Sequence, residues 1–191
     1  MSDIKDIVGV VAVGLTFLAY IPYYRDILKG KTHPHVYSWT LWGILTVLIT
    51  VLQIKGGAGI SALVTASAGL LCVGVIILGL KGGKRDITAS DTVTAILSLI
   101  AMAFWLVVDQ PLTAMILAVI ADLLAFYPTV RKSWHRPHSE TLSLYATNTL
   151  RFSLALIAVE NYTLLAMLWP AAWVVANGLF SLMLVWRRKA I

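Results

Sequence analysis

Long apolar runs alternate with short polar clusters along the whole chain. Each run is close to the length of a helix that crosses a lipid bilayer, which needs about 20 apolar residues. The clusters between the runs combine charged residues with glycine and proline, which are typical of turns. The pattern predicts seven helices, over residues 5–27, 36–54, 59–81, 91–108, 111–132, 140–159 and 163–187.

The composition indicates an integral membrane protein. Hydrophobic residues occupy 59% of the 191 positions and charged residues 13%, whereas soluble domains are about 25% charged. Seven spans use nearly the whole length, so we expect no soluble domain. The first residues are interpreted as the start of a span and not as a removed signal peptide, because a basic segment and a cleavage site are missing. The single cysteine, Cys72, excludes an intrachain disulfide.

Lysines and arginines gather at alternate connections between the predicted helices. Twelve of the fifteen follow the first, third, fifth and seventh helices, and only Lys5 and Lys55 lie on the other side. Basic residues favour the cytoplasmic side, so we expect the N-terminus outside and the C-terminus in the cytoplasm. This placement accounts for the net charge of +6 without nucleic acid, and Arg151 alone stays unexplained. The twelve are Arg25, Lys29, Lys31, Lys81, Lys84, Arg85, Arg131, Lys132, Arg136, Arg187, Arg188 and Lys189.

Two segments of the chain align without gaps at an offset of 106 residues, AYIPYYRDILKGKTHPHVYSWTLWG (19–43) and AFYPTVRKSWHRPHSETLSLYATNT (125–149). Each ends a helix with a small residue, an aromatic residue, any residue and proline, and an arginine follows three positions later. A basic loop with histidines and a new helix come next. The sequence thus predicts an all-α membrane protein in a 3+1+3 arrangement. Two parallel three-helix repeats (1–88 and 111–191) flank a linker helix (89–110).

These features resemble the PQ-loop/SWEET (MtN3-saliva) superfamily of seven-helix membrane transporters. The resemblance covers the whole chain in architecture and the two repeat cores in motif. Tyr23 and Thr129 stand where the family has the glutamine of its Pro-Gln pair. The resemblance implies a substrate site at the midplane, with Pro22 and Pro128 as hinges near the cytoplasmic gate. It also implies an asparagine of the seventh helix in the pocket, which is matched by Asn177.

The substrate class stays open on this resemblance. Sugar-type members carry prolines within the second and sixth helices, and this chain has none there. Vitamin transporters of the nicotinamide-riboside type share the 3+1+3 plan, and SWTLWG (38–43) is similar to their Trp-x-x-Trp element. Relatives of the lysosomal cystine-exporter type couple transport to protons through membrane aspartates.

One arginine and one aspartate are expected near the bilayer midplane. Arg151 would lie about 15 Å from either surface of a helix about 30 Å long, and its side chain reaches only about 7 Å. A central arginine costs about 3 kcal/mol, so it needs a partner or a hydrated cavity. Asp122 lies at matching depth on the preceding helix, and we expect an ion pair, either a structural bridge or part of the substrate path. The alternative is an arginine without contact to Asp122.

The seventh predicted helix carries a polar and aromatic stripe. Trp169, Trp173 and Asn177 are spaced i, i+4 and i+8 and therefore share a face. Trp169, near the helix end, is interpreted chiefly as an anchor at the membrane interface, whereas Trp173 lies deeper. Asn177 would hydrogen-bond either a solute in a cavity or a neighbouring helix.

The repeat makes the predicted site asymmetric. The polar residues of the second triplet have less polar counterparts in the first, so we expect one polar and one aromatic wall. Thr16 and Tyr20 share a stripe of the first helix that would either complete the cavity or serve helix packing. The corresponding positions are Asp122 and Thr16, Asn148 and Trp42, and Arg151 and Leu45.

Enzyme and metal chemistry find no support. Metalloprotease, serine-hydrolase and phosphate-loop motifs are missing. The four histidines lie in two loops without cysteines or carboxylate pairs that would complete a metal site. We therefore expect no enzyme activity, no metal and no cofactor.

The sequence predicts a transporter that moves a small polar solute by alternating access, either facilitated or proton-coupled. The solute could be a sugar, a vitamin or nucleoside, or an amino-acid-like molecule. The rival is a non-transporting binder, such as a sorting receptor of the KDEL-receptor type or an assembly factor. The expected partners are the solute and membrane lipid, and a homo-oligomer is compatible with the sequence. Asn177 and Asn148 would hydrogen-bond the solute, Trp173 and Trp42 would pack against it, and Asp122 with Arg151 would orient charge or relay a proton.

Overall fold

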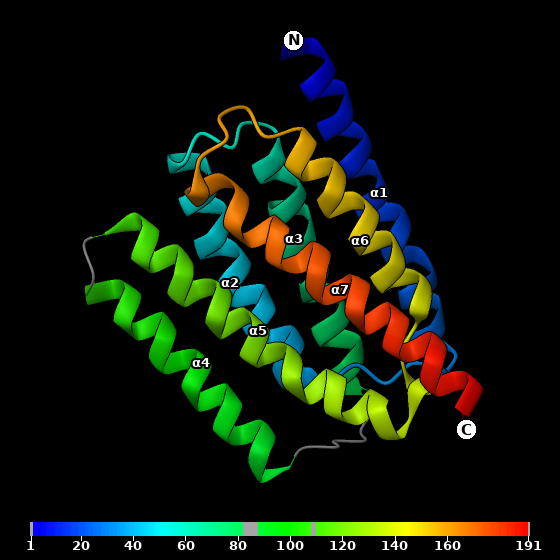
Figure 1. The fold of residues 1–191 in the computed structure, drawn as a ribbon. Coiled ribbons are helices and arrows are strands. Elements are labelled where there is room, and N and C mark those ends of the chain that lie inside the picture. The colour runs from blue at the N-terminus through cyan, green and yellow to red at the C-terminus, as the bar shows by residue number, and fades with distance from the viewer. Residues whose placement is uncertain (1, 82–87, 108–109, 191) are drawn as a thin grey trace.

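The computed structural model describes residues 2–81, 88–107 and 110–190, which form seven α-helices and one short 3₁₀ helix (Figure 1). Lys84 and Arg85 of the predicted basic loop and Asp109 lie outside the described residues. The elements are α1 (Ser2–Leu28), α2 (Val36–Lys55), α3 (Ser61–Lys81), α4 (Ala89–Val107), α5 (Pro111–His135), η1 (Pro137–Ser139), α6 (Leu142–Ile157) and α7 (Leu164–Ala190).

The prediction of seven helices is confirmed, but α6 is shorter than predicted. It has 16 residues and therefore a length of about 24 Å at 1.5 Å per residue. Glu140 and Thr141, which were expected within this helix, are extended. Their side chains accept or donate hydrogen bonds to residues of α1, for instance from Thr141 to Asp26 at 3.0 Å. Contacts with another helix thus replace the first turn of α6.

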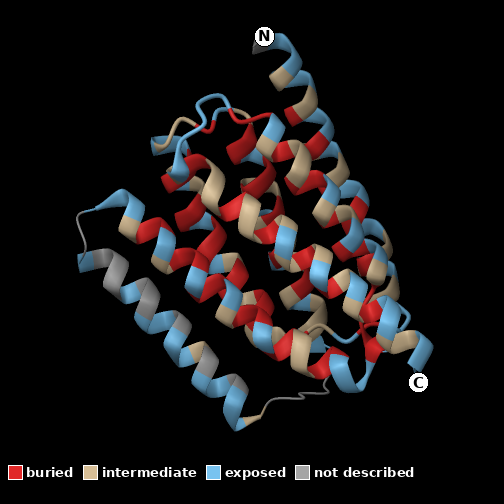
Figure 2. Cartoon of the chain, in the orientation of Figure 1, coloured by how far each residue is buried: buried red, intermediate tan, exposed pale blue. Residues whose placement is uncertain are grey.

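Exposed positions lie on the outside of the bundle and buried positions inside it (Figure 2). Many exposed side chains are large and apolar, and several buried ones are polar. Ile21, Val47 and Leu70 are 61%, 68% and 68% exposed, whereas Arg151 and Gln53 are buried. Such an apolar exterior suits lipid and not water. Five helices, α1, α2, α3, α5 and α7, are long and apolar enough to cross a membrane. The chain is therefore a multi-pass membrane protein.

The helices pack in two groups with the same internal order. α3 packs against both α1 and α2, and α7 packs against both α5 and α6. The groups meet where α1 lies against α6 and where α2 lies against α5. α4 runs along α5 at the edge of the bundle (Figure 1).

The two ends of the bundle carry different connections, and the termini lie at opposite ends (Figure 1). We call the end with connections 29–35 and 136–141 and the C-terminus the basic end. The N-terminal end carries the N-terminus and connections 56–60 and 158–163.

α2 and α3 are in tight contact at Gly69. A Cβ atom added to Gly69 would lie 2.5 Å from Thr46 Oγ1 and 3.1 Å from Thr46 Cβ. Thr46 is buried, and its hydroxyl donates a hydrogen bond to the carbonyl of Trp42 at 2.8 Å. Because a β-branched side chain in a helix has few rotamers, Thr46 cannot move aside cheaply.

We expect Gly69→Ala to lower the free energy of unfolding by about 1–3 kcal/mol, the usual cost of overpacking a core. Thermal unfolding of the purified protein in detergent measures this loss. Gly14→Ala is the matched control, since it also lies within a helix and a Cβ atom there would meet nothing within 4 Å. Equal melting temperatures for the two variants would contradict the tight α2–α3 contact.

Candidate functional site

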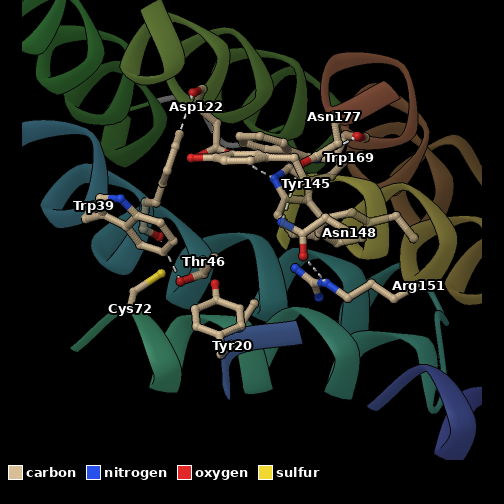
Figure 3. Close-up of a pocket in the computed structure, with 14 residues that line it drawn as sticks. Tyr20, Trp39, Thr46, Cys72, Asp122, Tyr145, Asn148, Arg151, Trp169 and Asn177 are labelled. Atoms are coloured by element: carbon tan, nitrogen blue, oxygen red, sulfur yellow. Dashed lines mark hydrogen bonds between the residues drawn. The ribbon is translucent and has the colours of Figure 1, made fainter. Parts of the chain in front are cut away.

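A cavity lies between the two groups of helices, at the centre of the bundle (Figure 3). Six helices line it, and only α4 does not contribute among the described residues. The space that admits water-sized molecules is about 40 Å³, enough for roughly three water molecules. The lining residues are Tyr20, Trp39, Trp42, Thr46, Ala68, Cys72, Asp122, Tyr145, Asn148, Arg151, Phe152, Trp169, Trp173 and Asn177.

The structure brings together the eight side chains that the sequence singled out for binding. Seven of them line the cavity, and Thr16 lies buried beside it as a partner of Arg151. Sequence reasoning missed Trp39, Tyr145 and Phe152, which also line it. Tyr145 and Phe152 follow the helical spacing of Asn148, at three residues before and four after, and this signal could have identified them.

Asp122 is buried, and two tryptophans donate hydrogen bonds to one oxygen of its carboxylate. Its Oδ2 accepts hydrogen bonds from Trp169 Nε1 at 2.7 Å and from Trp173 Nε1 at 2.6 Å. Its Oδ1 has no hydrogen-bond partner among the described residues. Trp42 Nε1 adds a hydrogen bond to the main-chain carbonyl of Asp122 at 3.2 Å. This carboxylate therefore joins α5 to α7, and its main chain joins α5 to α2.

The predicted ion pair between Asp122 and Arg151 is wrong. No basic side chain among the described residues lies within 4.0 Å of the Asp122 carboxylate. The reason is the order of the helices, because α7 packs against both α5 and α6. Asp122 on α5 consequently meets the indoles of α7 before it can reach α6.

Arg151 is held by neutral groups only. Its Nε donates to Asn148 Oδ1 at 2.7 Å, and its Nη1 donates to Thr16 Oγ1 at 3.2 Å and to the carbonyl of Val64 at 3.4 Å. The guanidinium carbon lies 3.9 Å from the centre of the Phe152 ring. Nη2 makes no hydrogen bond to the described residues, and none of their carboxylates lies within 4.0 Å. The cation is buried without a counter-ion.

Two asparagines extend the polar network from α6 to α7. Asn148 Nδ2 donates to Asn177 Oδ1 at 3.3 Å, and Asn177 Nδ2 donates to the carbonyl of Trp173 at 2.8 Å. With Arg151 the network runs from Thr16 on α1 to α7 and passes along one side of the cavity (Figure 3). Both asparagines thus face the cavity while they also hold helices together.

Aromatic rings enclose the rest of the cavity, and they come from both groups of helices. Trp42 and Trp173 meet edge to face with centroids 5.5 Å apart, and Phe152 and Trp169 do so at 4.9 Å. The expectation of an aromatic wall from the first triplet alone is therefore wrong. Trp169 is 2% exposed and hydrogen-bonds Asp122, so its interpretation as an interface anchor is wrong too. The Asp122 carboxylate on α5 thus meets two indoles of α7, whereas the Arg151 guanidinium on α6 lies on Phe152 of its own helix.

At the basic end, a buried acid hydrogen-bonds Tyr145, which lines the cavity. Glu140 accepts hydrogen bonds from Tyr23 at 3.1 Å, from Tyr145 at 3.0 Å and from Lys132 Nζ at 2.5 Å. Lys132 also donates to the carbonyl of His33. Tyr23 lies in α1 and His33 in the connection from α1 to α2, whereas Lys132, Glu140 and Tyr145 lie in the segment from α5 to α6. The network therefore ties the two groups together at this end.

The residues after the two prolines also cross between the groups. Pro22 and Pro128 lie inside α1 and α5. Tyr23, after the first proline, bonds Glu140, and the hydroxyl of Thr129, after the second, donates to Ser38 Oγ at 3.1 Å. Each proline thus precedes a hydrogen bond to the opposite group.

At the N-terminal end, main-chain and side-chain hydrogen bonds join the two groups, among them one from the Thr163 hydroxyl to the carbonyl of Gly56 at 2.8 Å. Glu160 N donates to the carbonyl of Ala58 at 3.3 Å, and Asn161 N donates to that of Gly57 at 3.0 Å. Gly57 has φ 74°, a left-handed conformation that glycine adopts at little cost. Contacts between the two groups therefore lie on both sides of the cavity.

No family model, no curated protein and no solved structure matches the chain.

We expect Trp173→Phe to lower the free energy of unfolding by about 1.5–3 kcal/mol, the range for a hydrogen bond to a charged group. Thermal unfolding in detergent measures the loss, with Trp186→Phe as control because Trp186 is 57% exposed. In an Asp122→Leu background the substitution at Trp173 should cost much less, since its acceptor is gone. Equal losses in both backgrounds would contradict the indole–carboxylate interaction.

Proposed function

We infer that the protein transports a small polar solute across the membrane by alternating access. The observation that carries this proposal is the position of the cavity. It holds a buried, uncompensated cation between two similarly packed groups of helices, and hydrogen bonds between the groups lie on both of its sides. Movement of one group against the other would open one set of hydrogen bonds at a time.

The packing supports two parallel repeats, helices α1–α3 and α5–α7, with α4 as linker. In this arrangement α1, α2 and α3 correspond to α5, α6 and α7. The contact between α1 and α6 then corresponds to the one between α5 and α2, and the contact between α2 and α7 to the one between α6 and α3. All four contacts occur. Residues of the cavity that correspond at the sequence offset of 106 also make corresponding contacts. Trp42 contacts the main chain of Asp122, and their counterparts Asn148 and Thr16 are joined through Arg151.

The small cavity is consistent with an occluded state. About 40 Å³ is too little for a sugar or a nucleoside, because ligand pockets usually measure about 300–1,000 Å³. A solute of that size would enter only after the groups separate at one end. Pro22 and Pro128 would supply the bending points, since proline removes one main-chain hydrogen bond inside a helix.

The proposed orientation has the basic end in the cytoplasm. Arg131, Lys132 and Arg136 lie there with the basic C-terminus, as expected for loops retained in the cytoplasm. This orientation and the repeat agree with the resemblance to the PQ-loop/SWEET superfamily. Asp122 would be the group that binds a coupling proton, if transport is proton-driven.

The rival function, a membrane receptor that binds without transport, shares the cavity and differs in flux. We expect Asn177→Ala to reduce solute uptake into proteoliposomes at least about tenfold, because two hydrogen bonds at the cavity are lost. The solute is first identified by thermal-shift screening of sugars, nucleosides and amino acids. Ser181→Ala, one turn further along α7, is the matched control. Tight binding without any flux would overturn transport and favour the receptor.

Tyr23→Phe should open the cavity more often at the basic end, because Glu140 loses a hydrogen bond from the opposite group. Cys72 is the only cysteine and lines the cavity, so its labelling by N-ethylmaleimide reports opening. We expect a rate increase of about tenfold, which corresponds to 1.4 kcal/mol.

Tyr127→Phe is the control for that measurement, since Tyr127 is 45% exposed. Cys72→Ser should abolish the labelling and so identify the reacting thiol. An unchanged rate in Tyr23→Phe would contradict a gate at Glu140.

A further inference from the structure

The cavity holds a cation, Arg151, that has no carboxylate within 4.0 Å among the described residues, and this cation suggests what the cavity binds. We propose that the transported solute carries a carboxylate and that Arg151 binds it. This proposal rests on the proposed function and names its substrate class. It follows from the partners of Arg151, from the geometry of its guanidinium group and from the rings around it.

The partners of Arg151 satisfy hydrogen bonds but do not neutralise charge. Asn148 and Thr16 offer neutral oxygens, and Val64 offers a main-chain carbonyl. A buried cation left without an anion costs several kcal/mol. An anionic ligand would remove that cost, whereas a neutral ligand would leave it in place. The cavity should therefore discriminate by charge.

The guanidinium group retains a donor for such a ligand. Its five N–H groups form a planar fork, of which Nε uses one and Nη1 uses two in the hydrogen bonds to the protein. Nη2 keeps two N–H groups without a partner among the described residues. Hydrogen bonds from a guanidinium to a carboxylate are short and about twice as strong as neutral ones.

The surrounding side chains fix the direction of this donor. The Arg151 guanidinium lies on the ring of Phe152 at 3.9 Å and is held on its Nε side by Asn148 at 2.7 Å. Figure 3 shows the guanidinium and the hydroxyl of Tyr20 both directed toward the open centre of the cavity. A carboxylate there would accept from Nη2 with one oxygen and from Tyr20 with the other.

Asp122 does not take the place of this anion. Its carboxylate is bonded by Trp169 and Trp173 at 2.7 and 2.6 Å, and it lies beyond 4.0 Å from Arg151. The indoles of these residues, with Trp42, would border the body of the solute. A short monocarboxylate fits the cavity of about 40 Å³. An aromatic monocarboxylate would suit the flat, apolar walls but would enter only after the two groups separate.

Pairs of ligands that differ only in charge test the proposal on the unmodified protein. Acetate, propionate and benzoate are compared with acetamide, propionamide and benzamide, in detergent and at constant ionic strength. We expect at least one acid to raise the melting temperature and to slow N-ethylmaleimide labelling of Cys72. Its dissociation constant should be at least tenfold lower than that of its amide. Equal effects of acid and amide, or an equal effect of chloride at the same concentration, would overturn the proposal.

Variants of Arg151 assign the effect to this residue. Arg151→Gln should abolish the preference for the acid, and Arg151→Lys should retain part of it, because lysine keeps the charge and loses the fork. Arg25→Gln, which removes an arginine whose side chain is 60% exposed, should change nothing. A preference for the acid that survives Arg151→Gln would overturn the assignment. If Arg151→Gln does not fold, the comparison with Arg151→Lys and the ligand pairs decides.

Proteoliposomes separate this proposal from the proposed function. Uptake of a neutral solute without any binding of acids would keep transport and overturn the carboxylate. Binding of an acid without uptake would keep the carboxylate site and overturn transport. Uptake of the acid, lost in Arg151→Gln, would support both.

Discussion

The carboxylate of Asp122, bonded by two indole N–H groups, is the interaction on which the centre of the bundle depends. It attaches α7 to α5, and α7 also packs against α6. In a bilayer the exterior offers no polar partners, so each buried polar group must be satisfied within the protein. Asp122 uses the indoles, and Arg151 on α6 is left to neutral oxygens of α1, α3 and its own helix. The separation of these two charges creates the polar cavity; an ion pair between them would have neutralised it.

Hydrogen bonds join the two groups of helices at both ends of the bundle. At the basic end, Glu140 accepts hydrogen bonds from both groups, and the main-chain N–H of His33 donates to the carbonyl of Ser139 at 3.1 Å. At the N-terminal end, main-chain groups of two connections pair with each other, with Gly57 in a left-handed conformation. The side chains of Lys5 and Thr163 add hydrogen bonds there, to the carbonyls of Val159 and Gly56 at 2.8 Å each. Both ends therefore combine main-chain and side-chain contacts, and the opening of either end would have to break both kinds.

Much of the fold could be predicted from the sequence, because hydrophobic length and the absence of charge are local properties. The seven helices and the membrane location followed from them. Two helices were placed too long, α3 by two residues at its start and α6 by two residues at each end, where Glu140 and Thr141 are extended and contact α1. Seven of the eight residues singled out for binding line the cavity and the eighth bonds Arg151. They were identified largely because a polar group inside the membrane needs a hydrogen-bond partner, a counter-ion or a hydrated cavity. The ion pair and the role of Trp169 could not be predicted, because both depend on which helices are neighbours in space.

The sequence by itself thus determined that this chain spans a membrane with helices, and that Asp122 and Arg151 lie within apolar segments and so need a partner or a hydrated cavity. Each of these follows from residue type and position along one helix. Only the tertiary structure decided that α7 lies against both α5 and α6, that Asp122 meets Trp169 and Trp173, and that Arg151 stays without a counter-ion. The physical reason is that helices adjacent in sequence need not be adjacent in the bundle. Close packing of small residues and rings selects the neighbours, and the neighbours determine which charges are compensated.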